Sequence, residues 1–344
     1  MEFNFLGRAF KGDKVIWCIF IALCIISLLE VFSATSTIAY RQQSHWAPIL
    51  RHGAFLLIGF AVVMFLQRVP SRFFSVLLLG LPLSAILLVV TMFMGEDVNG
   101  AQRWLGVGAF TIQPSEFAKI SAIGFVAFFL SKMKPDNESW IFKTLIIGIG
   151  GLCLLIAPEN LSTACLLFGV CFLMMFIGQV SLKKLGLIAL IGIGSIVLIF
   201  GGLALLPNSA KDYMPDRLAT WKNRIERHSN ENQVSIFDKE EDGSIAYKCE
   251  KKFPRYLILG AGLILTVQAL ANMAVAVNLI PVTGQPLPLV SRGGTSTIIT
   301  CAYFGIILAC SSKLNDSDHE DVDESIANVD FETFDGYETT TDLK

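Results

Sequence analysis

Residues 74–95 read FSVLLLGLPLSAILLVVTMFMG, a run of 22 residues without a charged side chain. About 20 apolar residues are enough for a helix to span the hydrocarbon core of a bilayer. Similar runs recur along most of the 344-residue chain, which is 53% hydrophobic, only 16% charged and has a mean hydropathy of +0.59. This composition excludes a soluble enzyme, a secreted disulfide scaffold and a disordered protein. It also disfavours a membrane β-barrel, whose strands alternate in short segments.

The pattern predicts an all-α fold, a polytopic transmembrane helical bundle with about nine spans. The expected spans cover residues 15–36, 51–68, 74–95, 115–132, 142–157, 160–179, 185–206, 255–280 and 287–311. The fifth and sixth are short and are separated only by PENLS, so they form either two short helices or a re-entrant corner.

Short basic loops predict the orientation of the bundle. The segments RVPSRF (68–73), SKMKP (131–135) and SLKK (181–184) fall on the same side as the basic N-terminus. Because basic loops remain in the cytoplasm, we expect this side to be inside. The outward-facing loops are then 37–50, 96–114 and 207–254.

The last of these loops conflicts with that orientation. Residues 207–254 contain no apolar stretch and begin outside, after the seventh span, but YKCEKKFPR (247–255) is typical of a cytoplasmic loop. A segment whose two ends lie on opposite sides of a membrane needs a crossing helix. The alternation of inner and outer loops is therefore broken near residues 235–247.

Charge divides the chain into a membrane domain, residues 1–314, and an acidic tail, residues 315–344. The tail holds eleven acidic residues and one basic residue, and the rest of the chain has 26 Lys and Arg against 18 Asp and Glu. The composition of the tail is typical of a disordered, solvated segment or of a docking tail.

The sequence indicates neither a metal site nor a disulfide framework. The eight cysteines include no CxxC pair, and the four histidines are scattered. No cofactor motif is evident, and a divalent cation remains compatible with the sequence.

The first group of candidate site residues lies around the start of the fourth span. Arg103 and Trp104 place a guanidinium group beside an indole ring. Pro114 suits the first turn of a helix, where the helix dipole favours the carboxylate of Glu116. Lys119 lies three residues further on and shares the face of Glu116. Such a pair is costly in a membrane unless it faces a cavity or a partner, so it is either functional or a neutralised anchor of the helix end.

The second group precedes the last span, in PVTGQPLPLVSRGGTS (281–296). Its three prolines and three glycines interrupt the apolar pattern, and irregular backbone at the membrane boundary is tolerated only inside protein or beside a watery cavity. Arg292 with Gly293 and Gly294 could receive a phosphate through a cation and free backbone amides, or could form a tight turn between helices.

Together these motifs resemble the SEDS family (shape, elongation, division and sporulation), of the FtsW/RodA type. The match covers most of residues 15–312, and PENLSTA with Gly-Gln-Pro-Leu-Pro looks closer to the cell-division branch, FtsW, than to the elongation branch. The matching stretches, in the family's order, are GAQRWLGVGAFTIQPSEFAK (100–119), APENLSTA (157–164), PDRLATWKNRI (215–225) and PVTGQPLPLVSRGGTS (281–296).

The resemblance implies a function. SEDS proteins are peptidoglycan glycosyltransferases of the bacterial inner membrane, usually with ten transmembrane helices, and they polymerise lipid II into glycan strands on the outer face. The implied process is septal cell-wall synthesis during cell division. The implied partners are lipid II, a class B penicillin-binding protein, other division proteins and the lipid bilayer, with no nucleic acid.

The resemblance also implies substrate-binding residues. An acceptor hydroxyl needs a base, and the donor pyrophosphate needs positive charge. Arg103, Lys119 and Arg292 fit the second need, and Glu116 could orient Lys119 or the substrate. The full set is Arg103, Trp104, Gln113, Glu116, Lys119, Arg292, Gly293 and Gly294.

The catalytic residue stays unknown because the chain departs from the family at one place. In the family, an aspartate that looks catalytic lies in a Thr/Ser-Asp-Phe context in a large outer loop, and an eighth helix follows. No Asp-Phe motif occurs between Trp221 and Phe253. The resemblance therefore implies a deletion near residues 235–247, which removes one crossing helix at the place where the alternation of loops is broken.

Several hypotheses therefore stay open. The chain is a glycosyltransferase in which an acidic residue of the loop replaces the lost base, or a lipid II transporter (flippase), or a catalytically inactive scaffold that holds a penicillin-binding protein. The acidic residues available in the loop are Asp238, Glu240, Glu241 and Asp242.

Overall fold

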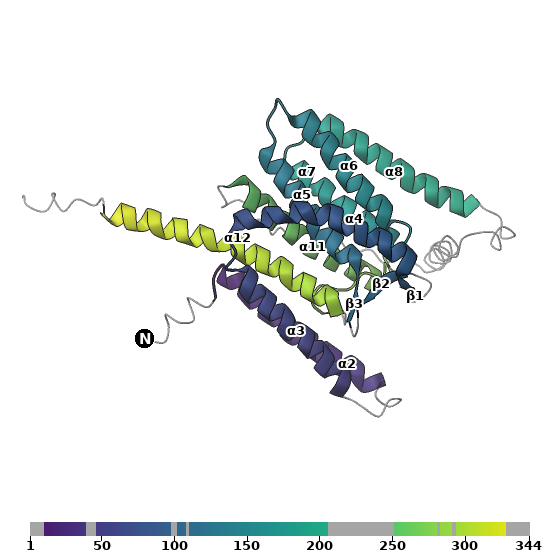
Figure 1. Ribbon diagram of the computed structural model, residues 1–344, viewed down its shortest axis with the longest axis horizontal. Helices are drawn as coiled ribbons and strands as arrows, with labels where there is room; N and C mark the ends of the chain where they lie inside the picture. Colours follow the sequence, from purple (N-terminus) through teal and green to yellow (C-terminus); the bar gives the residue numbers. More distant parts are fainter. Residues whose placement is uncertain are drawn as a thin grey trace, which may run out of the picture.

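The structure is a computed structural model that describes residues 10–38, 46–97, 102–107, 110–205, 251–280, 283–290 and 294–327. It is a bundle of long helices with a small antiparallel sheet at one end (Figure 1). The helices are α2 (Lys14–Ile38), α3 (Trp46–Leu66), the 3-10 helix η1 (Ser71–Val76), α4 (Leu77–Met94), α5 (Pro114–Lys132), α6 (Glu138–Ile156), α7 (Leu161–Ile177), α8 (Leu182–Leu205), α11 (Lys252–Ala276) and α12 (Gly294–Ala327).

The expected all-α membrane fold is confirmed. Each expected span has its own α-helix, and seven helices among the described residues are long and apolar enough to cross a membrane. α7 is a shorter apolar helix of 17 residues. The PENLS segment separates two helices because α6 ends at Ile156 and α7 begins at Leu161, with the Asn160 side chain accepting a hydrogen bond from the Thr163 amide at 3.2 Å.

The segment expected as an outward loop, residues 96–114, contains a small sheet. β1 (Glu96–Asp97), β2 (Gln102–Val107) and β3 (Phe110–Ile112) pair antiparallel in the order β1-β2-β3. The hairpin of β2 and β3 ends directly before α5, with Leu105 opposite Ile112. The sheet therefore leads the chain into the helix that carries Glu116 and Lys119.

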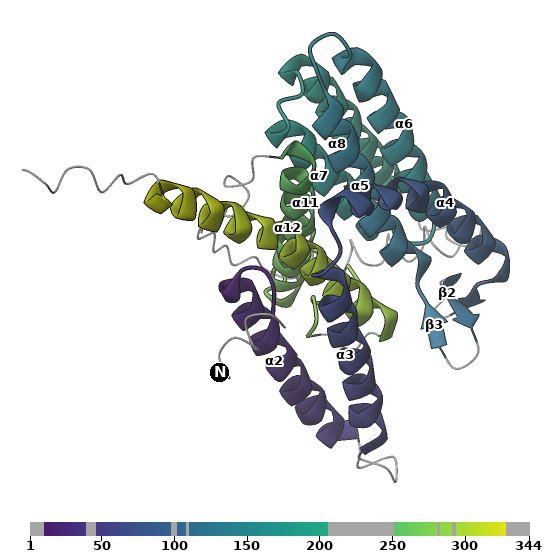
Figure 2. The ribbon, with the colours of Figure 1, turned by 60° about the vertical axis from the view of Figure 1, so that its left-hand side comes forward.

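Two helices lie inside the bundle and the others surround them. In α5 and in the first 19 residues of α12, 78% and 83% of the span is buried, whereas the other spans are 17–28% buried. α11 packs against both α5 and α12, and α12 also packs along α3 (Figure 2). The outer helices expose large apolar side chains such as Leu57, Phe93 and Leu154, as expected for surfaces that face lipid.

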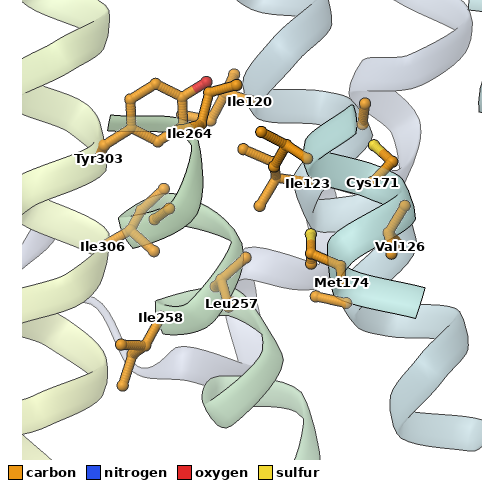
Figure 3. Packing of buried hydrophobic residues seen from close by; sticks show 14 of the residues in the cluster. Ile120, Ile123, Val126, Cys171, Met174, Leu257, Ile258, Ile264, Tyr303 and Ile306 are labelled. Atoms are coloured by element: carbon orange, nitrogen blue, oxygen red, sulfur yellow. The ribbon is translucent and has the colours of Figure 1, made fainter. Parts of the chain in front are cut away.

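Close packing of the central helices depends on small residues. Gly260 of α11 lies against Ile123 of α5 and Met174 of α7, and a Cβ atom there would come within 2.8 Å of both side chains. The surrounding cluster includes Leu257 and Tyr303 (Figure 3). Small residues let helix backbones approach closely, which is the main source of helix association where no hydrophobic driving force acts.

One end of the bundle gathers the basic loops. The amide of Asp13 donates to Ser311 Oγ at 3.2 Å, so the start of α2 lies beside α12 near residue 311. Lys184 Nζ lies 3.0 Å from Glu138 Oε1, which joins the starts of α6 and α8. At the same end Phe253 of α11 contacts Phe128 near the end of α5, with ring centroids 6.2 Å apart. The positive-inside rule assigns this end, the inner end, to the cytoplasm.

The opposite end, the outer end, gathers both candidate motifs. The start of α5 and residues 283–290 lie there together with the start of α7. α8 begins at the inner end and, at about 1.5 Å per residue, its 24 residues reach the opposite end, whereas α11 begins at the inner end again. The connection between Leu205 and Lys252 therefore joins opposite ends, and the deletion expected near 235–247 lies outside the described residues.

The last helix runs past the expected boundary of the acidic tail. α12 continues to Ala327, so residues 315–327 extend the helix that the sequence analysis ends near 311. The remaining tail, residues 328–344, lies outside the described part of the chain.

Candidate functional site

The centre of the candidate site is a buried ion pair on α5. Lys119 Nζ lies 2.8 Å from Glu116 Oε1, and the two side chains are 0% and 3% exposed. Pro114 occupies the first turn of the helix, and the Glu116 amide donates to the Gln113 carbonyl at 3.1 Å, so Glu116 sits where the helix dipole favours a carboxylate. Lys119 lies five residues past Pro114, about 7–8 Å along the helix axis.

Lys119 also reaches across to α11. Its ammonium group donates to Gln268 Oε1 at 3.2 Å, and Gln268 Nε2 donates to the Pro286 carbonyl at 2.6 Å. A carboxamide has only one oxygen, so the bond to Lys119 sets which end of the Gln268 amide faces residue 286. The amide thus joins the QPSEFAK motif to the GQPLP motif.

A second contact joins residues 283–290 to α7. Gln285 Nε2 donates to the hydroxyl of Thr163, a fully buried residue in the first turn of that helix. Asn160 caps the same turn, so the segment around PENLSTA and the GQPLP segment meet at one point. In the sequence, PENLSTA is a break between two spans and a match to the SEDS motifs; the structure places it in contact with Gln285.

Tyr303 of α12 adds a hydroxyl to this region. Its side chain is 2% exposed, and its hydroxyl has no hydrogen-bond partner among the described residues. Glu116 acts on it electrostatically, and Figure 3 shows the ring turned toward Ile120 and Ile264, from α5 and α11. The buried polar side chains of this region therefore come from α5, α11 and α12.

The structure places the other expected site residues as follows. Gln113 is buried and precedes α5, and Trp104 is half-buried in β2. Arg103 also belongs to β2, but its side chain lies outside the described part of the structure. Gly294 is the first residue of α12, packed against the Phe55 ring, while Arg292 and Gly293 lie outside the described residues.

Sequence reasoning missed the residues that connect the motifs. Gln268 lies within the expected span 255–280, and no sequence motif contains it. A buried amide in an apolar span is a signal in its own right, because polar groups inside a membrane need partners. The partner, in contrast, comes from a segment 18 residues away, and only the structure identifies it.

The ion pair lies at the outer end of the bundle, close to backbone without regular hydrogen bonding, and both of its charges are buried and paired with each other. No group of three or more His, Cys, Asp or Glu side chains is clustered as metal ligands among the residues that the structure describes.

A family profile described as FtsW/RodA/SpoVE, cell cycle protein, matches residues 13–235 and 243–316. A protein of Pseudomonas fluorescens named "Probable peptidoglycan glycosyltransferase FtsW" is 24% identical over 368 aligned positions, which cover 88% of each chain. Stage V sporulation protein E of Bacillus subtilis is 24% identical, covering 87% of this chain and 96% of its own.

Solved structures share the fold. One, described under the words "Structural coordination of polymerization and crosslinking by a peptidoglycan synthase complex", aligns with a TM-score of 0.68 at 22% identity and covers 88% of this chain and 98% of its own. The rod shape determining protein RodA of Thermus thermophilus aligns with a TM-score of 0.62 at 22% identity and covers 87% and 96%.

Proposed function

Because the chain belongs to the FtsW/RodA/SpoVE family of cell cycle proteins, we propose that it binds lipid II at the outer end of its bundle and polymerises it into glycan strands during septal cell-wall synthesis. The chain is a multi-pass protein of the inner membrane. One observation carries the proposal: the chain of contacts from Glu116 through Lys119 and Gln268 to the Pro286 carbonyl. Gln268, which lies 149 residues from Lys119, joins the motif of Lys119 to the motif of Pro286 in a single polar site.

The charged residues divide the work in this proposal. Arg103 and Arg292 supply positive charge to the donor pyrophosphate, and Gly293, Gly294 and Trp104 complete the substrate contacts. Lys119 has no exposed surface and is already bonded to Glu116 and Gln268. Lys119 could therefore contact a phosphate oxygen directly only if one of these two bonds broke. While both bonds are intact, Lys119 orients the Gln268 amide and, through it, residue 286. Gln113 orders the start of α5.

A divalent cation belongs to the same proposal. Such an ion would be held by the pyrophosphate oxygens of lipid II, and it would neutralise negative charge on the leaving group. Chelation with EDTA during the assay below should lower the rate, and added Mg²⁺ should restore it.

A class B penicillin-binding protein and other division proteins are the proposed protein partners. The similar structure that the words "peptidoglycan synthase complex" describe supports an assembly of this kind.

A second function is favoured by the break in the family match at residues 236–242. The alignment with the P. fluorescens protein spans 368 positions but contains only 88% of this chain, about 303 of its 344 residues. About 65 positions therefore have no residue of this chain opposite them. A lipid II-binding scaffold without polymerase activity accounts for a chain that retains the polar site and lacks the segment that carries the family's aspartate.

The deciding experiment is lipid II polymerisation by the purified chain with its penicillin-binding partner, read as glycan strands on a gel. The positive control carries a family-type loop and helix inserted near residue 240. Glycan strands that the unaltered chain forms and that Lys119→Met abolishes support the polymerase. A replacement base is then identified by loss of strands in one of four variants: Asp238→Asn, Glu240→Gln, Glu241→Gln or Asp242→Asn. Strands from the control alone, with lipid II bound by both, support the scaffold.

Two other outcomes contradict both functions. If neither the unaltered chain nor the control with the inserted loop and helix binds lipid II, lipid II is not the substrate. Movement of labelled lipid II across a vesicle bilayer, without strand formation, would assign the chain to the transporters instead.

A further inference from the structure

Residues 283–290 are irregular backbone held inside a membrane protein. Pro286 and Pro288 have no N–H group, and Leu289 has a φ of 61° in the left-handed region, which a leucine rarely adopts. Backbone carbonyls of such a segment need donors from the surrounding protein, because the hydrocarbon core supplies none. The Pro286 carbonyl receives its donor from Gln268, within the site described above.

The Leu289 carbonyl receives its donor from a different part of the molecule. Ser27 of α2 donates its hydroxyl to this carbonyl at 2.7 Å, and the same oxygen lies 2.7 Å from His52 Nε2 of α3. The Ser27 side chain is 0% exposed and His52 is 3% exposed. A serine hydroxyl has one proton, and the carbonyl takes it, so His52 Nε2 carries the proton that Ser27 accepts.

α2 and α3 form a hairpin that lies apart from the helices α4–α8, with α12 between them (Figure 2). Ser27 bonds this hairpin to the segment that also contacts Gln268 and Thr163, and His52 of the same hairpin bonds to the Ser27 hydroxyl. Leu289 lies three residues from Pro286. Its carbonyl is bonded by the α2–α3 hairpin, which contributes no residue to the ion pair of Glu116 and Lys119.

We propose that Ser27 and His52 are positioning residues of the substrate site, which hold residues 283–290 in place from the α2–α3 hairpin. The consequence for lipid II rests on the proposed function: displacement of Leu289 moves Pro286 and Gln285 and weakens substrate binding. Neither Ser27 nor His52 touches the substrate in this arrangement.

The test compares matched substitutions in the purified full chain. Ser27→Ala and His52→Leu remove the donors, whereas Ser27→Thr and His52→Gln keep a hydroxyl and an N–H. Ser84→Ala is the control, because Ser84 is equally buried but its hydroxyl bonds only within α4, to the Gly80 carbonyl.

Two measurements are made on each variant. Binding of fluorescent lipid II in nanodiscs should weaken about 3- to 10-fold in Ser27→Ala and His52→Leu, as expected for one lost hydrogen bond, and by less than twofold in the other three. Amide hydrogen exchange of residues 283–290 should accelerate by a similar factor in the same two variants, with the midpoint of thermal unfolding close to that of Ser84→Ala.

The outcomes separate this inference from the proposed function. If no version binds lipid II, the proposed function fails and the exchange rates alone decide the positioning role. If the amides of residues 283–290 exchange hydrogen in Ser27→Ala and His52→Leu at the same rate as in the Ser84→Ala control, the inference is wrong. This holds even when lipid II binds.

Discussion

Lys119 is a charged side chain with no exposed surface, and Glu116 is its counter-charge one turn away. Removing one partner of a buried pair leaves an uncompensated charge, which costs about 3–5 kcal/mol, whereas replacing both partners by neutral groups is often close to neutral. We therefore expect Glu116→Gln or Lys119→Met alone to destabilise the protein by several kcal/mol. The double variant should recover most of that loss in denaturant unfolding in micelles.

The double variant also separates folding from function at the residue scale. It should remain folded but fail to bind lipid II, because the orientation of Gln268 depends on Lys119. The partly exposed pair Lys184 and Glu138 is the control: neutralising either partner should change stability by less than about 1 kcal/mol. Additive losses in the Glu116 and Lys119 variants would contradict the coupling.

At the scale of helices, α3 and α12 pack more extensively than any other pair in the described residues. Gly305 makes this contact possible: a Cβ atom there would lie 2.8 Å from Leu66 Cβ and 3.3 Å from Val63 Cα. Because backbone cannot move aside as a flexible side chain does, we expect Gly305→Ala to destabilise the protein by about 1–3 kcal/mol.

Gly150 of α6 provides the matched control, since nothing lies within 4 Å of a Cβ atom built there. Gly150→Ala should be neutral or stabilising by up to about 1 kcal/mol, the difference in helix propensity. Equal effects of the two substitutions, measured by thermal unfolding in the same detergent, would show that α3 and α12 are not in close contact.

At the scale of the whole molecule, the bundle places the start of α2 and residue 311 of α12 together at the inner end. Asp13 bonds to Ser311, and the outer end holds residues 283–290. We therefore expect a cysteine appended after Lys344 to be protected from a membrane-impermeant maleimide in intact cells, and Thr283→Cys, whose residue is half-buried at the outer end, to be labelled. Both are introduced into a variant without native cysteines.

The reverse labelling would mean that α11 and α12 insert inverted. The GQPLP segment would then face the cytoplasm, away from Lys119, and the contacts of Gln268 and Gln285 described above could not form.

Hydropathy and charge patterns predict the nine helical spans and one half of the site, but not the small sheet within residues 96–112. Uncharged runs near the length of a bilayer predict each span because no other structure satisfies the backbone there, and Glu116 and Lys119 pair because three residues on a helix share a face. The sequence also located the topological conflict between the seventh span and YKCEKKFPR, since charge patterns alone assign the sides.

The insertion of the last two helices and the contacts that hold the second motif follow from helix packing, which the sequence pattern does not contain. The contacts of Gln268, Gln285 and Ser27 join residues 18, 122 and 262 positions apart, and helix periodicity carries no information about such distances. They depend on which faces of α2, α7 and α11 the packing turns toward residues 283–290. That choice follows from the shapes of the buried side chains and glycines, and a hydropathy pattern cannot distinguish these shapes.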